Sequence, residues 1–129
     1  MAKFSLIRGW LECSFEDIPQ IRVAIDEHWK YYEPYALTEK QAELYKNGWI
    51  FPSAPINWIS LVFYGGNVNE RATQFLKECL EKISRMELEV CGTFFVDDEE
   101  SEDLRVWTLS EGVFHDVKRD LSVKPKFIG

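Results

Sequence analysis

Apolar and polar residues alternate along several short stretches of this chain, which predicts β-strands. The clearest alternation runs through residues 57–64, where one phase contains Trp58, Ser60, Val62 and Tyr64 and the other contains Ile59, Leu61 and Phe63. Residues 4–13 also alternate, with apolar side chains in both phases, so we expect a strand buried on much of both faces. The glycines at 65 and 66 predict the end of the strand at 57–64.

Two segments place apolar residues three and four positions apart, the spacing of one helix face. The first runs from Ile18 to Tyr32, and Pro34 predicts that it ends at Glu33. The second runs from residue 70 to residue 83, with Asn67 or Asn69 as its N-cap. The sequence therefore predicts two long amphipathic helices.

The remaining elements are short. Thr38 opens a capping-box pattern, which predicts a short helix stopped by Gly48, and residues 49–51 suit an edge strand cut off by Pro52. Strands are also predicted at 89–96 and 104–109, with one more short strand after the turn at Glu111 and Gly112. Residues 118–129 are expected to form a flexible tail.

This order of elements predicts an α+β fold. A single, mostly antiparallel sheet with both long helices on one face would bury both apolar helix faces. The expected topology is the ferredoxin-like βαββαβ arrangement with an extra C-terminal hairpin strand. No repeat or composition shift divides the chain, so residues 1–129 are expected to form a single domain.

The net charge of −7 is concentrated in one segment. Six of the seven residues from 97 to 103 are acidic, namely Asp97, Asp98, Glu99, Glu100, Glu102 and Asp103. Without them the chain has 16 acidic and 15 basic residues, a net charge of −1. This segment joins two predicted strands, and such a localised potential favours a basic partner and disfavours nucleic acid.

Composition narrows the protein class. Apolar content of 46% and aromatic content of 15% exclude a disordered chain, and no apolar run is long enough to cross a bilayer. Arg8 interrupts any signal-peptide apolar region, and Cys13, Cys79 and Cys91 are scattered and odd in number. We therefore expect a cytoplasmic protein with buried, unpaired thiols.

Residues for catalysis, metals or cofactors are sparse. His28 is expected to be a partly exposed helix residue, while His115 and Asp116 are neighbours in a strand and so point to opposite faces. Three isolated cysteines and two isolated histidines do not make a zinc site, and the glycines match no phosphate-binding motif. The sequence predicts no enzyme activity, no cofactor and no metal.

The acidic segment has three interpretations. It can be a solvated loop that discourages edge-to-edge sheet pairing, or an anionic patch that docks a cationic partner. A calcium site is a third alternative, although the segment lacks the EF-hand spacing and its central glycine. Docking is the functional hypothesis, with the six acids as partner-binding residues.

Three stretches resemble a group of small bacterial immunity proteins encoded beside polymorphic toxins, including those of contact-dependent growth inhibition. They are residues 8–13 (RGWLEC), 48–52 (GWIFP) and 56–66 (INWISLVFYGG), followed by a similar stretch at 92–99 (GTFFVDDE). The resemblance implies a cytoplasmic inhibitor that binds and neutralises a cognate toxin domain, commonly a nuclease. An acidic surface can occlude the basic active site or substrate channel of such an enzyme.

Tight binding also needs desolvated aromatic anchors, for which Tyr31, Tyr35 and Tyr45 are candidates. The alternative function is a small regulatory or ligand-binding α+β module without catalysis. In neither case do we expect nucleic acid or a membrane as partner.

Overall fold

The computed structural model describes residues 3–99 and 104–119. In chain order the elements are β1 (Phe4–Cys13), α1 (Ile18–Trp29), α2 (Glu39–Lys46), β2 (Trp49–Ile50), β3 (Ser60–Asn69), α3 (Glu70–Ser84), β4 (Cys91–Asp98), β5 (Leu104–Ser110) and β6 (Val113–Arg119). Single 3-10 turns, η1 (Phe15–Asp17) and η2 (Glu33–Tyr35), precede and follow α1. The expected α+β class is confirmed.

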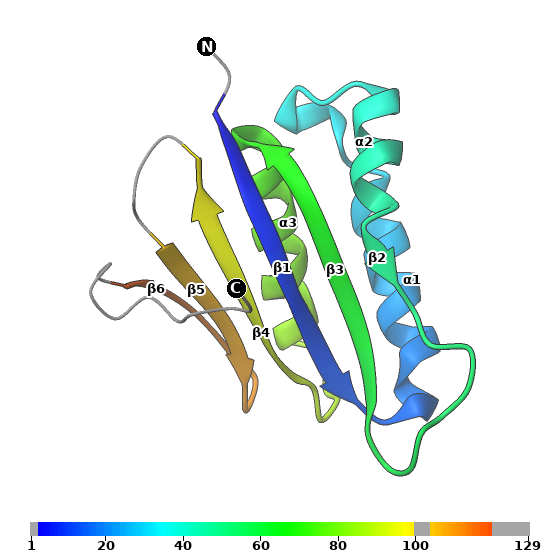
Figure 1. Ribbon diagram of the computed structural model, residues 1–129. Coiled ribbons are helices and arrows are strands. Elements are labelled where there is room, and N and C mark those ends of the chain that lie inside the picture. The colour runs from blue at the N-terminus through cyan, green and yellow to red at the C-terminus, as the bar shows by residue number, and fades with distance from the viewer. Residues whose placement is uncertain (1–2, 100–103, 120–129) are drawn as a thin grey trace.

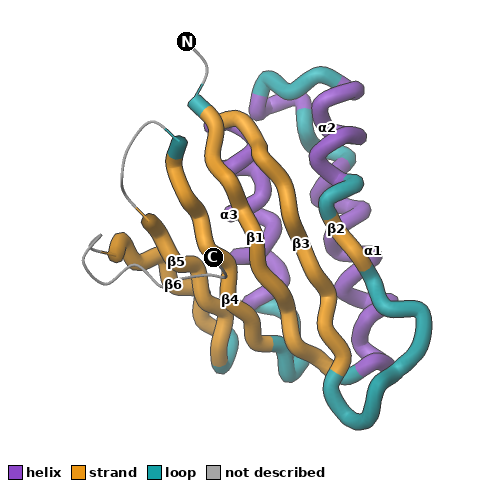
Figure 2. Tube along the Cα trace, viewed as in Figure 1, coloured by secondary structure: helices purple, strands orange, loops and turns teal. Residues whose placement is uncertain are grey.

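The six strands form one sheet in the order β2-β3-β1-β4-β5-β6, and every neighbouring pair is antiparallel. Helices α1 and α3 lie behind this sheet on one face, with α2 beside α1 near the β2 edge (Figures 1 and 2). The described core is one cluster that joins this face to the two long helices. Its members include Ile7 and Phe94 from the sheet, Ile21 and Ile25 from α1, and Phe75 from α3.

Helix ends follow the predicted caps where local hydrogen bonds decide them. Asn69 caps α3 by accepting from the Ala72 N–H at 2.8 Å, and Thr38 forms the predicted capping box with Gln41. Helix α1 ends at Trp29, before the predicted Glu33. Its continuation tightens into hydrogen bonds between residues three apart, and Pro34 lies in the separate turn η2.

The glycines at 65 and 66 do not end their strand. Strand β3 begins later than predicted, at Ser60, and continues through both glycines to Asn69 because β1 pairs with it along its whole length. The Gly65 N–H also donates to the Gly48 carbonyl at 3.1 Å. Pairing on both sides therefore outweighs the weak strand preference of glycine.

The C-terminal hairpin is longer than predicted. Glu111 and Gly112 have φ of 51° and 78°, the positive values of a type I′ turn, which closes the pair Ser110 and Val113. Strand β6 then extends to Arg119, so residues 118 and 119, expected in a flexible tail, belong to the sheet. The rest of that expected tail, residues 120–129, lies outside the described residues.

Candidate functional site

The acidic segment is only partly a loop. Asp97 and Asp98 are the last residues of β4, half-buried and on opposite faces of the strand, while the exposed Glu99 accepts from Asn67 Nδ2 at 3.0 Å. Glu100, Glu102 and Asp103 lie outside the described residues. The three described acids thus face different surroundings, and docking by the six acids stays a prediction.

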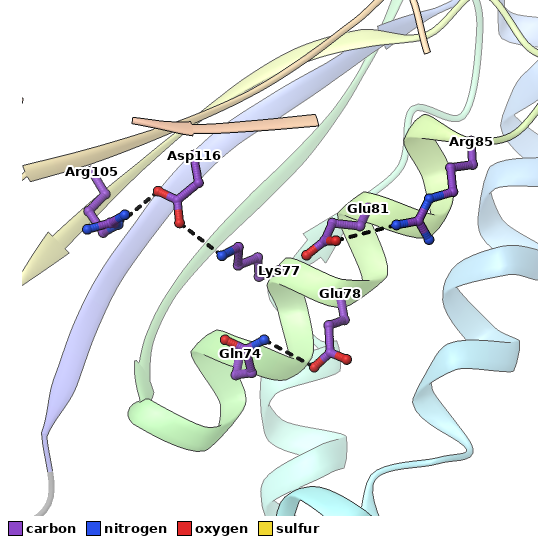
Figure 3. Close-up of polar contacts among 7 residues, drawn as sticks. All are labelled: Gln74, Lys77, Glu78, Glu81, Arg85, Arg105 and Asp116. Atoms are coloured by element: carbon purple, nitrogen blue, oxygen red, sulfur yellow. Dashed lines mark hydrogen bonds and ion pairs between the residues drawn. The ribbon is translucent and has the colours of Figure 1, made fainter. Parts of the chain in front are cut away.

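A charged cluster lies between α3 and the last hairpin. Asp116 accepts from Arg105 Nε at 2.8 Å and pairs with Lys77 Nζ at 3.0 Å (Figure 3). These residues line a cleft of about 250 Å³. Partial burial alone would raise the pKa of Asp116, but the hydrogen bonds from Arg105 and Lys77 outweigh it and lower that pKa. Lys77, Arg105 and Asp116 thus neutralise one another within the cleft.

Among residues 3–99 and 104–119, neither histidine forms a hydrogen-bonded pair with a carboxylate. His115 pairs with Thr108 and Asp116 with Trp107, so the two neighbours point to opposite faces of the sheet, as the alternation predicts. His28 is buried, at 3% exposed, which corrects the expectation of a partly exposed side chain. Its Nε2 donates to the Phe75 carbonyl at 2.8 Å and its Nδ1 accepts from Lys82 Nζ at 3.0 Å. His28 therefore links the two long helices.

The three cysteines are free thiols, as expected, but only two of them are buried. Burial raises the pKa of Cys13 to about 11 and that of Cys79 to about 12, so neither is a thiolate at neutral pH. Cys91 is exposed, contrary to expectation. Within residues 3–99 and 104–119, no group of three or more His, Cys, Asp or Glu is arranged to hold a metal ion.

Large apolar side chains are exposed where β2 and β3 meet the loop between them. We call this set the β2–β3 patch; its members are Ile50, Trp58, Ile59, Leu61 and Phe63. Leu61 and Phe63 lie on the sheet face opposite the helices, alternating with the buried Val62 and Tyr64. Ile50 pairs directly with Phe63, which brings their side chains together on that face.

Trp58 is the most exposed member of the β2–β3 patch. Its side chain is 88% exposed, and Ile50 and Phe63 are 62% and 45% exposed. Asn57, with φ of 59°, forms the turn that presents Trp58 just before β3 begins. On the sheet face opposite the helices, Leu104 and Val106 of β5 are buried, so the exposed apolar side chains of this face are concentrated near β2 and β3. Exposed apolar side chains that gather at one sheet edge and include a tryptophan are typical of a protein-binding site.

The three tyrosines proposed as anchors have different surroundings. Tyr31 is 63% exposed and remains available to a partner. The ring of Tyr35 packs edge-on against Phe75 with centroids 4.8 Å apart, and burial raises the pKa of Tyr35 to about 12. Tyr45 is half-buried, and its carbonyl accepts from the Tyr64 hydroxyl at 2.7 Å. Tyr35 and Tyr45 are thus largely engaged in packing.

Sequence reasoning missed the β2–β3 patch, although a signal was present. Both phases of residues 57–64 are apolar, whereas helices on a single face can cover only one phase. The other phase, with Leu61 and Phe63, had to face away from the helices.

No helix within residues 3–99 and 104–119 is long and apolar enough to cross a membrane. Comparisons of this chain with protein-family models, with curated proteins and with solved structures found no match.

Proposed function

We propose that this protein is a binding protein without catalytic activity, an immunity protein that neutralises a cognate bacterial toxin domain. The observation that carries the proposal is the β2–β3 patch, with Trp58 at 88% exposed. Solvent exposure of a tryptophan is costly for an isolated chain, and burial of such a residue at the centre of an interface typically contributes 2 kcal/mol or more to binding.

The kind of partner is inferred from charge and from the sequence resemblance. The chain carries a net charge of −7, and a basic toxin domain would be attracted to it over a distance. A nuclease has a basic channel because its substrate is a polyanion, so an acidic inhibitor can associate with it rapidly and block it. The resemblance to immunity proteins supplies the toxin class, and such an inhibitor would act in the cytoplasm.

We also propose the finer topology predicted from the sequence, a ferredoxin-like arrangement with an added hairpin. The order β2-β3-β1-β4, with α1 and α2 between β1 and β2 and with α3 between β3 and β4, supports this. Strands β5 and β6 then form the addition, beyond β4.

The proposal predicts that a toxin domain is encoded beside this gene, and that domain supplies the test. Co-expression is expected to restore growth, and the two proteins are expected to purify as a 1:1 complex. No complex and no rescue would contradict the proposal.

A variant pair tests the β2–β3 patch within that complex. Trp58→Ser with Phe63→Ser is expected to weaken toxin binding at least 30-fold, which corresponds to about 2 kcal/mol. Val117→Thr is the matched control, since Val117 is 49% exposed but lies in β6 at the opposite edge of the sheet. If both proteins bind as tightly as the wild type, the β2–β3 patch is not the interface.

A further inference from the structure

A groove runs between α1 and α2, on the helix side of the sheet. It has a volume of about 620 Å³. Its apolar lining comes from Val23, Trp29 and Tyr32 of the α1 segment and from Ala42 of α2. Val23 is 59% exposed, although it lies on a helix that otherwise buries its apolar face.

Direct hydrogen bonds hold the two walls of this groove in place. The indole Nε1 of Trp29 donates to the Ala42 carbonyl at 2.7 Å, which joins α1 to α2. The capping box of Thr38 fixes the first turn of α2. Lys46 of α2 also pairs with Asp26 of α1 at 2.8 Å. A groove held in this way needs little reorganisation to accept a partner.

The rim of the groove is acidic. It contains four carboxylates, on Asp26, Glu27, Glu39 and Glu43, against the two ammonium groups of Lys30 and Lys46. Both ammonium groups are already paired, Lys30 with Glu27 at 2.9 Å and Lys46 with Asp26. Among the described residues, Glu39 and Glu43 have no ion pair. Two carboxylates on one wall are therefore left over for an external cation.

The groove continues towards the sheet edge that carries the β2–β3 patch. A second hollow of about 460 Å³ shares Asp26, Glu43 and Lys46 with the groove and extends to Trp49 and Phe51. Helices α1 and α2 and strand β2 lie together at this edge of the molecule (Figure 1). The groove therefore opens on the helix side of the same sheet edge whose other face carries Ile50.

We propose that this groove binds a segment of the partner protein that carries lysine or arginine. An apolar side chain of that segment would cover Val23 and Tyr32, and its cationic side chains would pair with Glu39 and Glu43. The inference rests on the proposed function and places the electrostatic contact on α2. The acids at the end of β4 would then contribute to long-range attraction without direct contact.

The first test uses the complex with the adjacent toxin domain. Glu39→Gln with Glu43→Gln is expected to weaken binding about 10-fold and to reduce its dependence on NaCl concentration. The matched control is Glu87→Gln with Glu89→Gln, which removes the same two charges from exposed positions between α3 and β4. If the two double variants weaken binding equally, or if neither weakens it, the groove is not the site of contact. The proposed function, toxin binding, would still stand.

The second test does not need the toxin, so it remains decisive if the proposed function fails. The ¹⁵N-labelled protein is titrated with a short synthetic helical peptide that has lysine on one face and leucine on the other. Amide shifts are expected in residues 23–46 and are expected to disappear in the Glu39→Gln, Glu43→Gln protein. Shifts centred on residues 97–99, or no saturable shifts, would overturn the proposal.

A second copy of this chain is the alternative occupant of the groove. Sedimentation velocity over a range of concentrations shows whether the protein is a monomer or a dimer. A monomer leaves the groove open to the partner, as proposed. A dimer that dissociates when Val23 is replaced by Asp would show that the groove is a contact between copies and would contradict the proposal.

Discussion

Because His28 is buried, we expect the free energy of unfolding to depend on pH in a specific way. The imidazole is 3% exposed and stacks on Phe75 with ring centroids 4.4 Å apart. Burial lowers its pKa, the hydrogen bond to the Phe75 carbonyl opposes this change, and the positive charge of Lys82 lowers the pKa further. The native protein therefore holds His28 neutral at pH values where the unfolded chain already binds a proton.

The direction of the effect follows from that difference. As the pH falls below about 6.5, the unfolded state takes up a proton that the native state refuses, so the free energy of unfolding decreases. The decrease stops once the pH is below the native pKa. Each unit by which the native pKa is lowered costs about 1.4 kcal/mol at pH values below both pKa values.

The assay is urea unfolding between pH 5 and pH 8, for the wild type and for His28→Gln. Glutamine cannot titrate, so the fall in stability below pH 6.5 is expected to disappear. At pH 8 the variant is expected to lose about 1–3 kcal/mol, because it no longer stacks on Phe75.

The chain has only two histidines, so a change in the pH profile can be assigned to one of them by substitution. His115 is exposed, so His115→Gln is the matched control for the loss of an imidazole. An unchanged pH profile in His28→Gln, or one abolished by His115→Gln, would refute the account of His28 given above.

Three further predictions concern other parts of the molecule. Trp58→Ser alone is expected to change the free energy of unfolding by less than about 0.5 kcal/mol, because the side chain is exposed; a larger loss in urea unfolding would mean that Trp58 supports the fold. Asp116→Asn is expected to cost about 1–2 kcal/mol at pH 7. Since the native pKa of Asp116 is lowered, this cost is expected to fall as the pH drops below about 4, and an equal loss at pH 3 would contradict it. Asn69→Ala removes the N-cap of α3 and is expected to cost about 1 kcal/mol, whereas Asn69→Asp, which keeps an acceptor oxygen, is expected to cost less.

The acidic segment needs its own experiment, since three of its acids lie outside the described residues. We expect Glu99→Gln, Glu100→Gln, Glu102→Gln and Asp103→Asn together to slow toxin association without changing dissociation, the result for long-range attraction. Stopped-flow kinetics at low and high salt measure both rates. A faster dissociation would instead place these side chains in the interface.

The local sequence pattern determined most of the helices and strands, because the periodicity and the caps that form them involve residues only a few positions apart. The period of the apolar residues in α3 and the capping box at Thr38 are short-range features that the structure has, and of the two candidate caps of α3, Asn67 and Asn69, it uses Asn69. Periodicity also indicated an α+β protein with an antiparallel sheet. These are properties that neighbouring residues settle by hydrogen bonding and side-chain alternation.

Only the tertiary structure decided where elements end and which faces are covered. Strand β3 crosses two glycines because β1 pairs with it, and His28 is buried because α3 supplies a carbonyl and a lysine. Leu61 and Phe63 of the β2–β3 patch face solvent because both phases of β3 are apolar while the helices cover only one of them, and Trp58 is exposed because it lies in the turn before β3. Burial depends on residues distant in the sequence, so local pattern could name Trp58 and Phe63 as apolar but could not say that they face solvent.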